Sequence, residues 1–510
     1  MQNGYVHQER ILLNLPQGST KLRGVLLYPQ SYAVGMSSLA THTLYAGLND
    51  EEMRWERAFV DPARDSTRYA QVCSLESRTL LRDFDVIAIT SSFELDWAAI
   101  PAALEGGGVP PLRETRRGRP LIIAGGPAIA AAPLPLSALY DAAYIGEIEP
   151  ALAELKRALL APSPQETLEQ LAEIPGFFVP DLHTELVPQM LKRRCARNLD
   201  EFDTTSVMLT PEAEFADRFL IEMGRGCGRS CSFCLARRLY RPLRWRSLGR
   251  VVDAARRGLQ YTDDLGFVAA AVSDYPQLDE LCAELSGLSP QLRVSTSSVR
   301  MESATPTFLN LLASGGQRTV TYAPEAATER LRAAIGKDLP DEAIFGAIDR
   351  AAAAGLSRVR LYFMIGLPTE TASDRMAIAD LAQRLTRAFP GLHFRLNVGA
   401  FSPRPHTPFE YEPLPALRDL RNWLSQVQRS LRGLPHVEVS TDSARWAAMQ
   451  AAMSRADQRL GLAFVNHPPM AFGDLVESFA AEGLDFDELI AAPDEGSFLP
   501  WKVVDPACSE

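Results

Sequence analysis

Short, continuous hydrophobic runs alternate with helical stretches along the first third of the chain. Runs of this kind are typical of strands in a parallel sheet whose two faces are both covered. The runs occupy residues 23–29, 56–61, 85–92, 120–127 and 142–147. Five such strand–helix units predict a doubly wound, flavodoxin-like domain over residues 1–165, in which ligands bind beyond the carboxyl ends of the strands.

A second series of strand-like runs begins after a mixed, proline-punctuated stretch at residues 166–212, which we expect to be a connector without cofactor chemistry. The six runs occupy residues 219–226, 265–274, 292–299, 318–326, 358–368 and 393–403. Six units are too few to close an eight-stranded barrel, so we expect a partial (β/α)6 barrel over residues 213–412. Residues 413–510 are predicted to be mostly helical, and the fold class is α/β.

Composition and charge narrow the class of protein. Of 510 residues, 46% are hydrophobic and 23% are charged, which is the balance of a soluble globular chain with room for several domains. The formal net charge of -11 repels nucleic acid and anionic membranes unless a local patch reverses it. The first residues do not resemble a secretory signal and no apolar run is long enough to cross a bilayer, so we expect a cytoplasmic location.

Three of the seven cysteines fall within eight positions, in the segment GRGCGRSCSFC at residues 224–234. This crowding indicates metal ligation rather than a disulfide scaffold. The segment follows the first strand of the predicted barrel, at the end where such folds place catalysis. Cys227, Cys231 and Cys234 would ligate three irons of a [4Fe-4S] cluster and leave the fourth iron open. A zinc site would need a fourth ligand, and no histidine or further cysteine lies nearby in the sequence.

The CxxxCxxC spacing, with Phe233 before the last cysteine, resembles the signature of the radical S-adenosylmethionine (SAM) superfamily. The resemblance implies that Phe233 lies at the cofactor and that the open iron binds the amino and carboxylate groups of SAM, whose C–S bond one electron then cleaves. Further segments look like one subgroup of that superfamily, the radical SAM proteins with a cobalamin-binding domain. They include YAVGMSSLATHTLY, IIAGGP, IGEIEP, AVSDYP, QRTVTYAPEA and IGLPTET. The first domain would then be cobalamin-binding-like, and the implied cofactors are a [4Fe-4S] cluster, SAM and cobalamin.

By the same resemblance, five polar residues at the carboxyl ends of the barrel strands would contact SAM. Glu325, after the fourth strand, would hold the methionine amine or the ribose. The residues after the second and third strands are Ser273, Asp274, Ser298 and Arg300. Arg300 would meet the methionine carboxylate through a charge-assisted hydrogen bond. The alternative for each residue is a helix cap or a surface ion pair.

The first domain departs from the cobalamin-binding pattern. Gly125, Gly126 and Gly146 stand at strand ends, where a corrinoid tail would pass close to the backbone. The Asp-x-His-x-x-Gly loop that supplies a lower cobalt ligand in many such modules is missing, and PQSYAVGMSS stands in its place. His42 lies on a predicted helix and is expected to be packed or exposed rather than a ligand. Either cobalamin binds here without histidine ligation, or the domain has lost it.

The run RRLYRPLRWRS at residues 237–247 carries five arginines interleaved with Tyr240 and Trp245. Such a patch suits phosphates or stacked bases. It is isolated on an acidic chain, so we favour docking of an acidic one-electron donor such as flavodoxin, or support of the cysteine loop, over nucleic acid. The substrate is expected to be a small molecule or a peptide, and no membrane partner is expected.

Three functions remain open from the sequence. The first is a cobalamin-dependent radical SAM enzyme, most simply a methyltransferase acting at an unactivated carbon. The second is a radical SAM enzyme without cobalamin, such as a methylthiotransferase, although that class carries three additional N-terminal cysteines and only Cys73 and Cys195 precede the barrel. The third is an iron–sulfur protein that does not turn over.

Overall fold

The computed structural model divides the chain into two compact units. The first unit comprises Met1–Asp217 together with Met449–Glu510, and the second comprises Arg218–Ala448. The structure describes residues 8–16, 18–60, 71–116, 118–296, 299–469, 471–494 and 497–509. Within these ranges, no helix has the length and hydrophobicity that crossing a bilayer would need. The segment 413–510, expected to be one helical domain, is divided between the two units because its later helices pack with the first.

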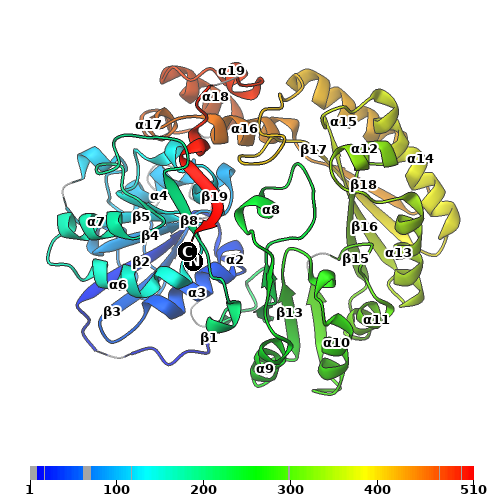
Figure 1. Ribbon diagram of the computed structural model, residues 1–510, viewed down its shortest axis with the longest axis horizontal. Coiled ribbons are helices and arrows are strands. Elements are labelled where there is room, and N and C mark those ends of the chain that lie inside the picture. The colour runs from blue at the N-terminus through cyan, green and yellow to red at the C-terminus, as the bar shows by residue number, and fades with distance from the viewer. Residues whose placement is uncertain are drawn as a thin grey trace. The chain divides into compact units, whose positions relative to one another are not determined.

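A six-stranded sheet forms the centre of the first unit (Figure 1). Its strands are β2 (Leu22–Tyr28), β3 (Met53–Phe59), β4 (Val86–Thr90), β5 (Leu121–Gly125), β6 (Ala142–Tyr144) and β7 (Phe177–Phe178). Their order across the sheet is β3-β2-β4-β5-β6-β7, in which the first five are parallel and β7 is antiparallel to β6. The order of the five parallel strands is that of flavodoxin-like folds, as the sequence predicts.

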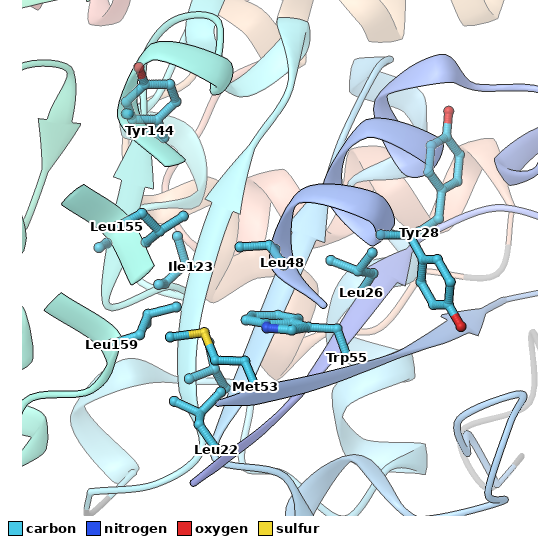
Figure 2. Packing of buried hydrophobic residues seen from close by; sticks show 14 of the residues in the cluster. Leu22, Leu26, Tyr28, Leu48, Met53, Trp55, Ile123, Tyr144, Leu155 and Leu159 are labelled. Carbon is cyan, nitrogen blue, oxygen red and sulfur yellow. The ribbon is translucent and has the colours of Figure 1, made fainter. Parts of the chain in front are cut away.

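The hydrophobic runs become strands of this sheet because its residues are covered on both faces. Six residues of the seven in β2, and six of the seven in β3, are buried. The helices α3 (Leu39–Leu48) and α6 (Leu152–Leu159) share one hydrophobic cluster with these strands, and Trp55 of β3 lies near Leu48 within it (Figure 2). Gly24 of β2 leaves room for the indole, since a Cβ there would lie 2.5 Å from the ring of Trp55.

The predicted connector contributes secondary structure to the first unit. It contains most of α7 (Pro164–Glu173), the sheet strand β7 and the strand β8 (Leu191–Arg194). β8 pairs in parallel with β19 (Val504–Ser509), and the neighbouring Cys195 and Cys508 form a disulfide. These two cysteines are 313 residues apart in the sequence, so the last strand completes structure that begins in the connector.

The second unit contains two parallel sheets (Figure 1). One has the strand order β10-β13-β14 and the other has the order β15-β16-β17-β18. The strands are β10 (Phe219–Glu222), β13 (Asp264–Val268), β14 (Arg293–Thr296), β15 (Thr319–Glu325), β16 (Arg358–Ile365), β17 (His393–Ala400) and β18 (Val437–Thr441). The backbone N–H of Val299 donates to the carbonyl of Thr321, so the chain beyond β14 lies against β15. All six strands predicted for the barrel are present.

The seventh strand, β18, lies in a segment that the sequence predicts to be helical. Its five residues stand between α15 (Leu417–Leu431) and α16 (Ala444–Arg455), where two strong helical patterns obscure a short alternating one. The helices α13 (Asp341–Ala353) and α14 (Ala372–Ala388) lie on one side of this sheet (Figure 1). Residues of β16 alternate between buried and more exposed positions, so the opposite side carries the polar side chains.

His42 lies on α3 and is buried. Its Nδ1 accepts a hydrogen bond from the backbone N–H of Val207 at 3.0 Å, and its Nε2 donates to the carbonyl of Met36 at 3.0 Å. The backbone therefore occupies both nitrogens of the neutral ring. Burial lowers the pKa of His42 to about 4. The prediction of a packed histidine is confirmed.

We predict that His42 makes the first unit sensitive to acid. Its ordinary pKa is 6.5 and its pKa in the folded protein is about 4. Between these values the unfolded chain binds a proton that the folded chain does not, so the stability is complete above pH 6.5 and falls as the pH drops toward 4. The loss is about 3 kcal/mol.

The variant His42→Asn checks this prediction because asparagine can accept the bond from Val207 but cannot titrate. Urea unfolding gives the free energy of unfolding of both proteins between pH 7 and pH 4. As the pH falls, the free energy of unfolding of the native protein should decrease by about 3 kcal/mol relative to that of the variant. A difference that stays constant over this range would contradict the prediction.

Candidate functional site

Cys227, Cys231 and Cys234 lie in one loop that follows the first strand of the second unit. The loop leaves β11 (Gly224–Arg225), and α8 (Leu235–Leu239) begins directly after Cys234. The helix α8 stands near the centre of Figure 1. Cys234 interacts electrostatically with Cys227, and Cys231 with Cys234. The structure thus brings together the three predicted cluster ligands.

Two of these thiols are largely removed from water. Burial raises the pKa of Cys231 and of Cys234. The nearby cations Lys337 and Arg300 oppose the shift of Cys231, and the backbone N–H of Arg237 opposes that of Cys234. Because the thiolate is the form that binds metal, occupation of this site by iron would release protons from the loop.

The base of the cysteine loop is closed by β12 (Arg244–Trp245), which pairs antiparallel with β11. Arg244 and Arg246 are both buried. The guanidinium of Arg246 donates to Glu222 of β10 at 2.8 Å. At least two of the five arginines in the run 237–247 therefore support the loop, which agrees with one of the two roles expected for that run.

The tip of the loop is fastened to the turn that follows α12 (Glu329–Ala334). The backbone N–H of Ser232 donates to the carbonyl of Ile335 at 2.9 Å, and the hydroxyl of Ser230 donates to the carbonyl of Gly336 at 2.8 Å. Gly336 has a φ of 72°, and a Cβ there would lie 2.4 Å from the carbonyl oxygen of Ser230. Only glycine both ends the helix in this conformation and lets the loop approach so closely.

Phe233 anchors the loop through hydrophobic contact. Its partly buried ring packs against a cluster at the carboxyl ends of β15 and β16. The buried members of this cluster are Ala326, Leu331, Ile335, Leu367 and Phe401. The aromatic residue of the signature therefore has a structural role beside the one expected for it at the cofactor.

Glu325 ends β15 in a left-handed backbone conformation, with a φ of 69°. Its Oε1 lies 3.4 Å from the Nζ of Lys337, which also donates to the carbonyl of Ala323. Burial raises the pKa of Glu325, and the charges of Lys337 and Arg300 oppose this shift. Lys337 is not predicted from the sequence, where its one signal is its place directly after the helix-ending Gly336.

Ser273, Asp274 and Arg300 lie together beyond β13. The hydroxyl of Ser273 accepts the backbone N–H of Arg300 at 2.8 Å, and the guanidinium of Arg300 lies 3.8 Å from Asp274. Arg229 of the cysteine loop, also missed from sequence, donates two hydrogen bonds of 2.9 and 3.1 Å to Asp274. Burial would raise the pKa of Asp274, but its hydrogen bonds outweigh burial and lower it. Ser298 lies outside the described residues.

Two polar groups therefore adjoin the cysteine loop. Glu325 and Lys337 reach it from the end of β15, and Asp274 is tied to it from the end of β13. Arg300 connects the two groups, because its charge acts on both Glu325 and Asp274. A partly buried carboxylate beside two cations complements the amine and the carboxylate of an amino acid.

The described residues contain no group of three or more histidine, cysteine, aspartate or glutamate side chains that converge as a single metal ion requires. A [4Fe-4S] cluster has different geometric requirements, because each cysteine binds a different iron. Three thiols on a loop fixed at its base and at its tip, with Cys234 in electrostatic contact with Cys227 and Cys231, are compatible with such a cluster.

In the first unit, two of the three glycines predicted to contact a corrinoid lie against backbone carbonyls of the same unit. A Cβ on Gly126 would lie 2.4 Å from the carbonyl oxygen of Ser91, and one on Gly146 would lie 2.3 Å from that of Arg194. Gly125 differs, since its nearest neighbour among the described residues would be 4.0 Å from a Cβ. Of the three glycines, Gly125 therefore has space beside it.

The strand order of the first unit reverses between β2 and β4, where doubly wound folds bind ligands. Hydrogen bonds of 3.2 Å join the two strand ends there. The hydroxyl of Tyr28 donates to Ser92, and the side-chain amide of Gln30 donates to Asp96. Burial raises the pKa of Asp96 to about 6. The loop that replaces the histidine-bearing motif is thus bonded to its neighbour.

Two protein families match parts of the chain. The radical SAM superfamily matches residues 221–382, and the family described as radical SAM proteins, N-terminal, matches residues 40–180. The uncharacterized protein MJ0966 of Methanocaldococcus jannaschii is 27% identical over 441 residues, which are 85% of this chain and 89% of that protein. A radical SAM domain implies a [4Fe-4S] cluster and SAM.

Solved structures of a radical SAM methyltransferase, TsrM from Kitasatospora setae, have a similar fold. The structure with cobalamin and a [4Fe-4S] cluster bound has a TM-score of 0.53 and 16% identity, and the match covers 77% of this chain and 74% of TsrM. The structure with tryptophan and a SAM analogue bound has a TM-score of 0.52 and 16% identity, covering 76% and 75%. At this identity the similarity concerns the fold alone.

We predict that Gly336→Ala reduces retention of an iron–sulfur cluster. The added methyl group would meet the carbonyl of Ser230 and push the tip of the cysteine loop away from the turn. The iron and sulfide content after anaerobic reconstitution should fall to about half or less of the native value, since misplaced ligands weaken metal sites by about tenfold or more.

Gly355→Ala is the matched control for this prediction. Gly355 also has a positive φ, of 87°, but no atom lies within 4 Å of the position of its Cβ. The control therefore carries the same backbone strain, about 1 kcal/mol, without the contact. Equal iron content in the two variants would contradict the role assigned to the turn.

Proposed function

The chain belongs to the radical SAM superfamily, and we propose that it is a cobalamin-dependent enzyme of that superfamily, most simply a methyltransferase acting at an unactivated carbon. The observation that carries this proposal is the cysteine loop, held beside a partly buried carboxylate and two cations at the carboxyl ends of the strands. The fold shared with TsrM, whose structure contains both cobalamin and a [4Fe-4S] cluster, supports the cofactor set.

Different residues of the second unit would bind the cluster and SAM. Cys227, Cys231 and Cys234 would hold the cluster through three of its irons. When bound, the cluster supplies the electron that cleaves the C–S bond of SAM. Lys337 and Arg300 would bind the methionine carboxylate. Ser273 and Asp274 fix the position of Arg300.

Two further groups complete this arrangement. Glu325 would accept hydrogen bonds from the methionine amine or from the ribose, as its place beside Lys337 permits. Arg229 joins the cysteine loop to Asp274, so the loop and the residues beyond β13 are positioned together. The ring of Phe233 shields one side of the loop from water.

The first unit is the proposed cobalamin module. Its strand order is flavodoxin-like, and Gly125 stands at a strand end with open space beside it. When bound, cobalamin would carry the methyl group. His42 is fully engaged with the backbone, so it would not ligate the cobalt.

A radical SAM enzyme without cobalamin is the second candidate. It is favoured by Gly126 and Gly146, because contacts within the chain already explain both glycines. A methylthiotransferase has less support. Cys73 and Cys195 are the cysteines that precede the barrel, and Cys195 is bonded to Cys508.

The proposed partners are an acidic one-electron donor such as flavodoxin and a small-molecule or peptide substrate. The donor would dock beside α8, which carries Arg237 and Arg238. Burial and the neighbouring charges of Arg237 and Arg241 lower the pKa of Arg238. Crowded cations of this kind attract an acidic surface, and the acidic remainder of the chain repels it.

Anaerobic purification with hydroxocobalamin tests the cofactor set. The absorbance spectrum should show about one corrinoid per chain, and its absence would favour the second candidate. After chemical reduction with SAM, the protein should release 5'-deoxyadenosine. Cys231→Ala should abolish this release, whereas Cys282→Ala, which removes a buried cysteine of the same unit, should not. Release of equal amounts by both variants would contradict the proposed cluster site.

Glu325→Gln should weaken SAM binding by about 1 kcal/mol or more, because a neutral hydrogen bond replaces a charge-assisted one. Calorimetry on the reconstituted, unreduced protein measures this affinity. Glu342→Gln, at an exposed position on α13, is the control and should bind SAM as the native protein does. Unchanged affinity in Glu325→Gln would remove that residue from the site.

A further inference from the structure

The helix-free face of the sheet β15–β18 carries a row of polar residues. Strand register places Thr321 beside Arg360, Arg360 beside Arg395, and Arg395 beside Glu438. Side chains of residues paired in this way point to the same face of a parallel sheet. The helices α13 and α14 lie on the other side (Figure 1), so the row faces the interior of the partial barrel.

Arg360 is the residue of this row whose side chain lacks, among the described residues, a hydrogen-bond acceptor for a buried nitrogen. Its side chain is partly buried, and its Nε is buried without a hydrogen-bond partner in the described part of the chain. The neighbours on the adjacent strands are Thr321 and Arg395, so register provides no carboxylate beside it. Arg395 can be neutralised by Glu438, but Arg360 cannot. Two guanidinium groups on adjacent strands repel each other unless an anion lies between them.

The next row toward the cysteine loop is also polar. Register places Tyr362 beside Asn397 and Asn397 beside Ser440. The side-chain oxygens of Asn397 and Ser440 are buried and lack hydrogen-bond partners among the described residues. Tyr362 is 38% exposed. This row can therefore bind an uncharged polar group and pack against an apolar one.

The rise per residue along β16 gives the distance from these rows to the proposed SAM site. Glu325 is paired in register with Phe363, three residues beyond Arg360 on β16. A strand rises about 3.3 Å per residue, so Arg360 lies about 10 Å below Glu325 along the sheet. A molecule that touches both ends would be about as long as a chain of six to eight atoms.

We infer that the substrate is an elongated small molecule with an anionic end, a carboxylate or a phosphate, that Arg360 and Arg395 bind. Its middle part would lie against Tyr362, Asn397 and Ser440, and its reacting carbon would lie at the carboxyl ends of the strands. This inference rests on the proposed function, because the radical SAM chemistry places the reacting carbon there.

Binding of four six-carbon probes tests the inference. The probes are hexyl phosphate, hexanoate, hexanol and hexylammonium, and calorimetry measures their affinity for the unreduced protein saturated with SAM. SAM then occupies Lys337 and Arg300, so that a probe anion meets the barrel interior. At least one anionic probe should bind, and hexanol and hexylammonium should bind at least about tenfold more weakly. The stronger of the two anionic probes identifies the phosphate or the carboxylate as the preferred group.

Two variants and a control locate the binding. Arg360→Gln should weaken the better anionic probe by about tenfold or more. Arg360→Glu should reverse the preference and bind hexylammonium better than either anion, which also shows that the variant is folded. Arg421→Gln removes an exposed arginine on α15 and should change nothing. Hexanol binding as tightly as the anions, or full affinity in Arg360→Gln, would overturn the inference.

These measurements are independent of turnover, because no reductant is present. Failure of the binding test with normal release of 5'-deoxyadenosine would overturn the anionic substrate and leave the proposed function standing. Anion binding without any 5'-deoxyadenosine release would overturn the proposed function instead.

Discussion

The candidate site depends on one backbone contact, in which the tip of the cysteine loop rests on the turn after α12. Holding three cysteines together in a short loop costs conformational entropy, so the loop needs an external support before iron binds. Ser230 and Ser232 provide it through carbonyls of the turn. The same turn carries Lys337 to the end of β15. One glycine, Gly336, therefore positions both the cysteine loop and a cation that acts on Cys231.

Charge is distributed unevenly in this protein. The chain as a whole is acidic, with a formal net charge of -11, yet Arg300, Lys337 and Arg360 lie on the concave side or at the strand ends of the second unit. Cations inside an otherwise acidic molecule attract small anionic groups, while the acidic remainder repels large acidic polymers. The cations of the second unit thus complement the carboxylate of SAM and the anionic end of the elongated substrate that we propose.

Local signals made much of the fold predictable from sequence. Hydrophobic runs identified the strands of both units, and the crowding of Cys227, Cys231 and Cys234 identified the loop. The strand β18 was not predicted because it is short and flanked by stronger helical patterns. Lys337 and Arg229 were not predicted because their roles arise from tertiary contacts that no sequence spacing encodes. Ser273, Asp274, Arg300 and Glu325 are where the family resemblance expects them, although their contacts to SAM stay predictions.

The glycines of the first unit show a further limit of sequence reasoning. A glycine at a strand end signals that something lies close to the backbone, but the sequence does not say what. For Gly126 and Gly146 the neighbour is another part of the same chain, whereas a Cβ on Gly125 would meet nothing closer than 4.0 Å among the described residues. The signal was correct for Gly126 and Gly146, whose φ values of 98° and 148° are positive, but Gly125 has no such backbone conformation.

The first unit is built from two stretches of sequence that are separated by the entire second unit. Ribosomes add residues from the N-terminus at roughly 5 to 20 per second, so the sheet β2–β7 emerges about ten seconds or more before residues 449–510. During that interval the surface of α4 (Ala99–Gly106) that later receives α17 (Arg459–Asn466) remains uncovered. The barrel, being continuous in sequence, can mature first, and a nascent chain must protect its unfinished N-terminal module until translation ends.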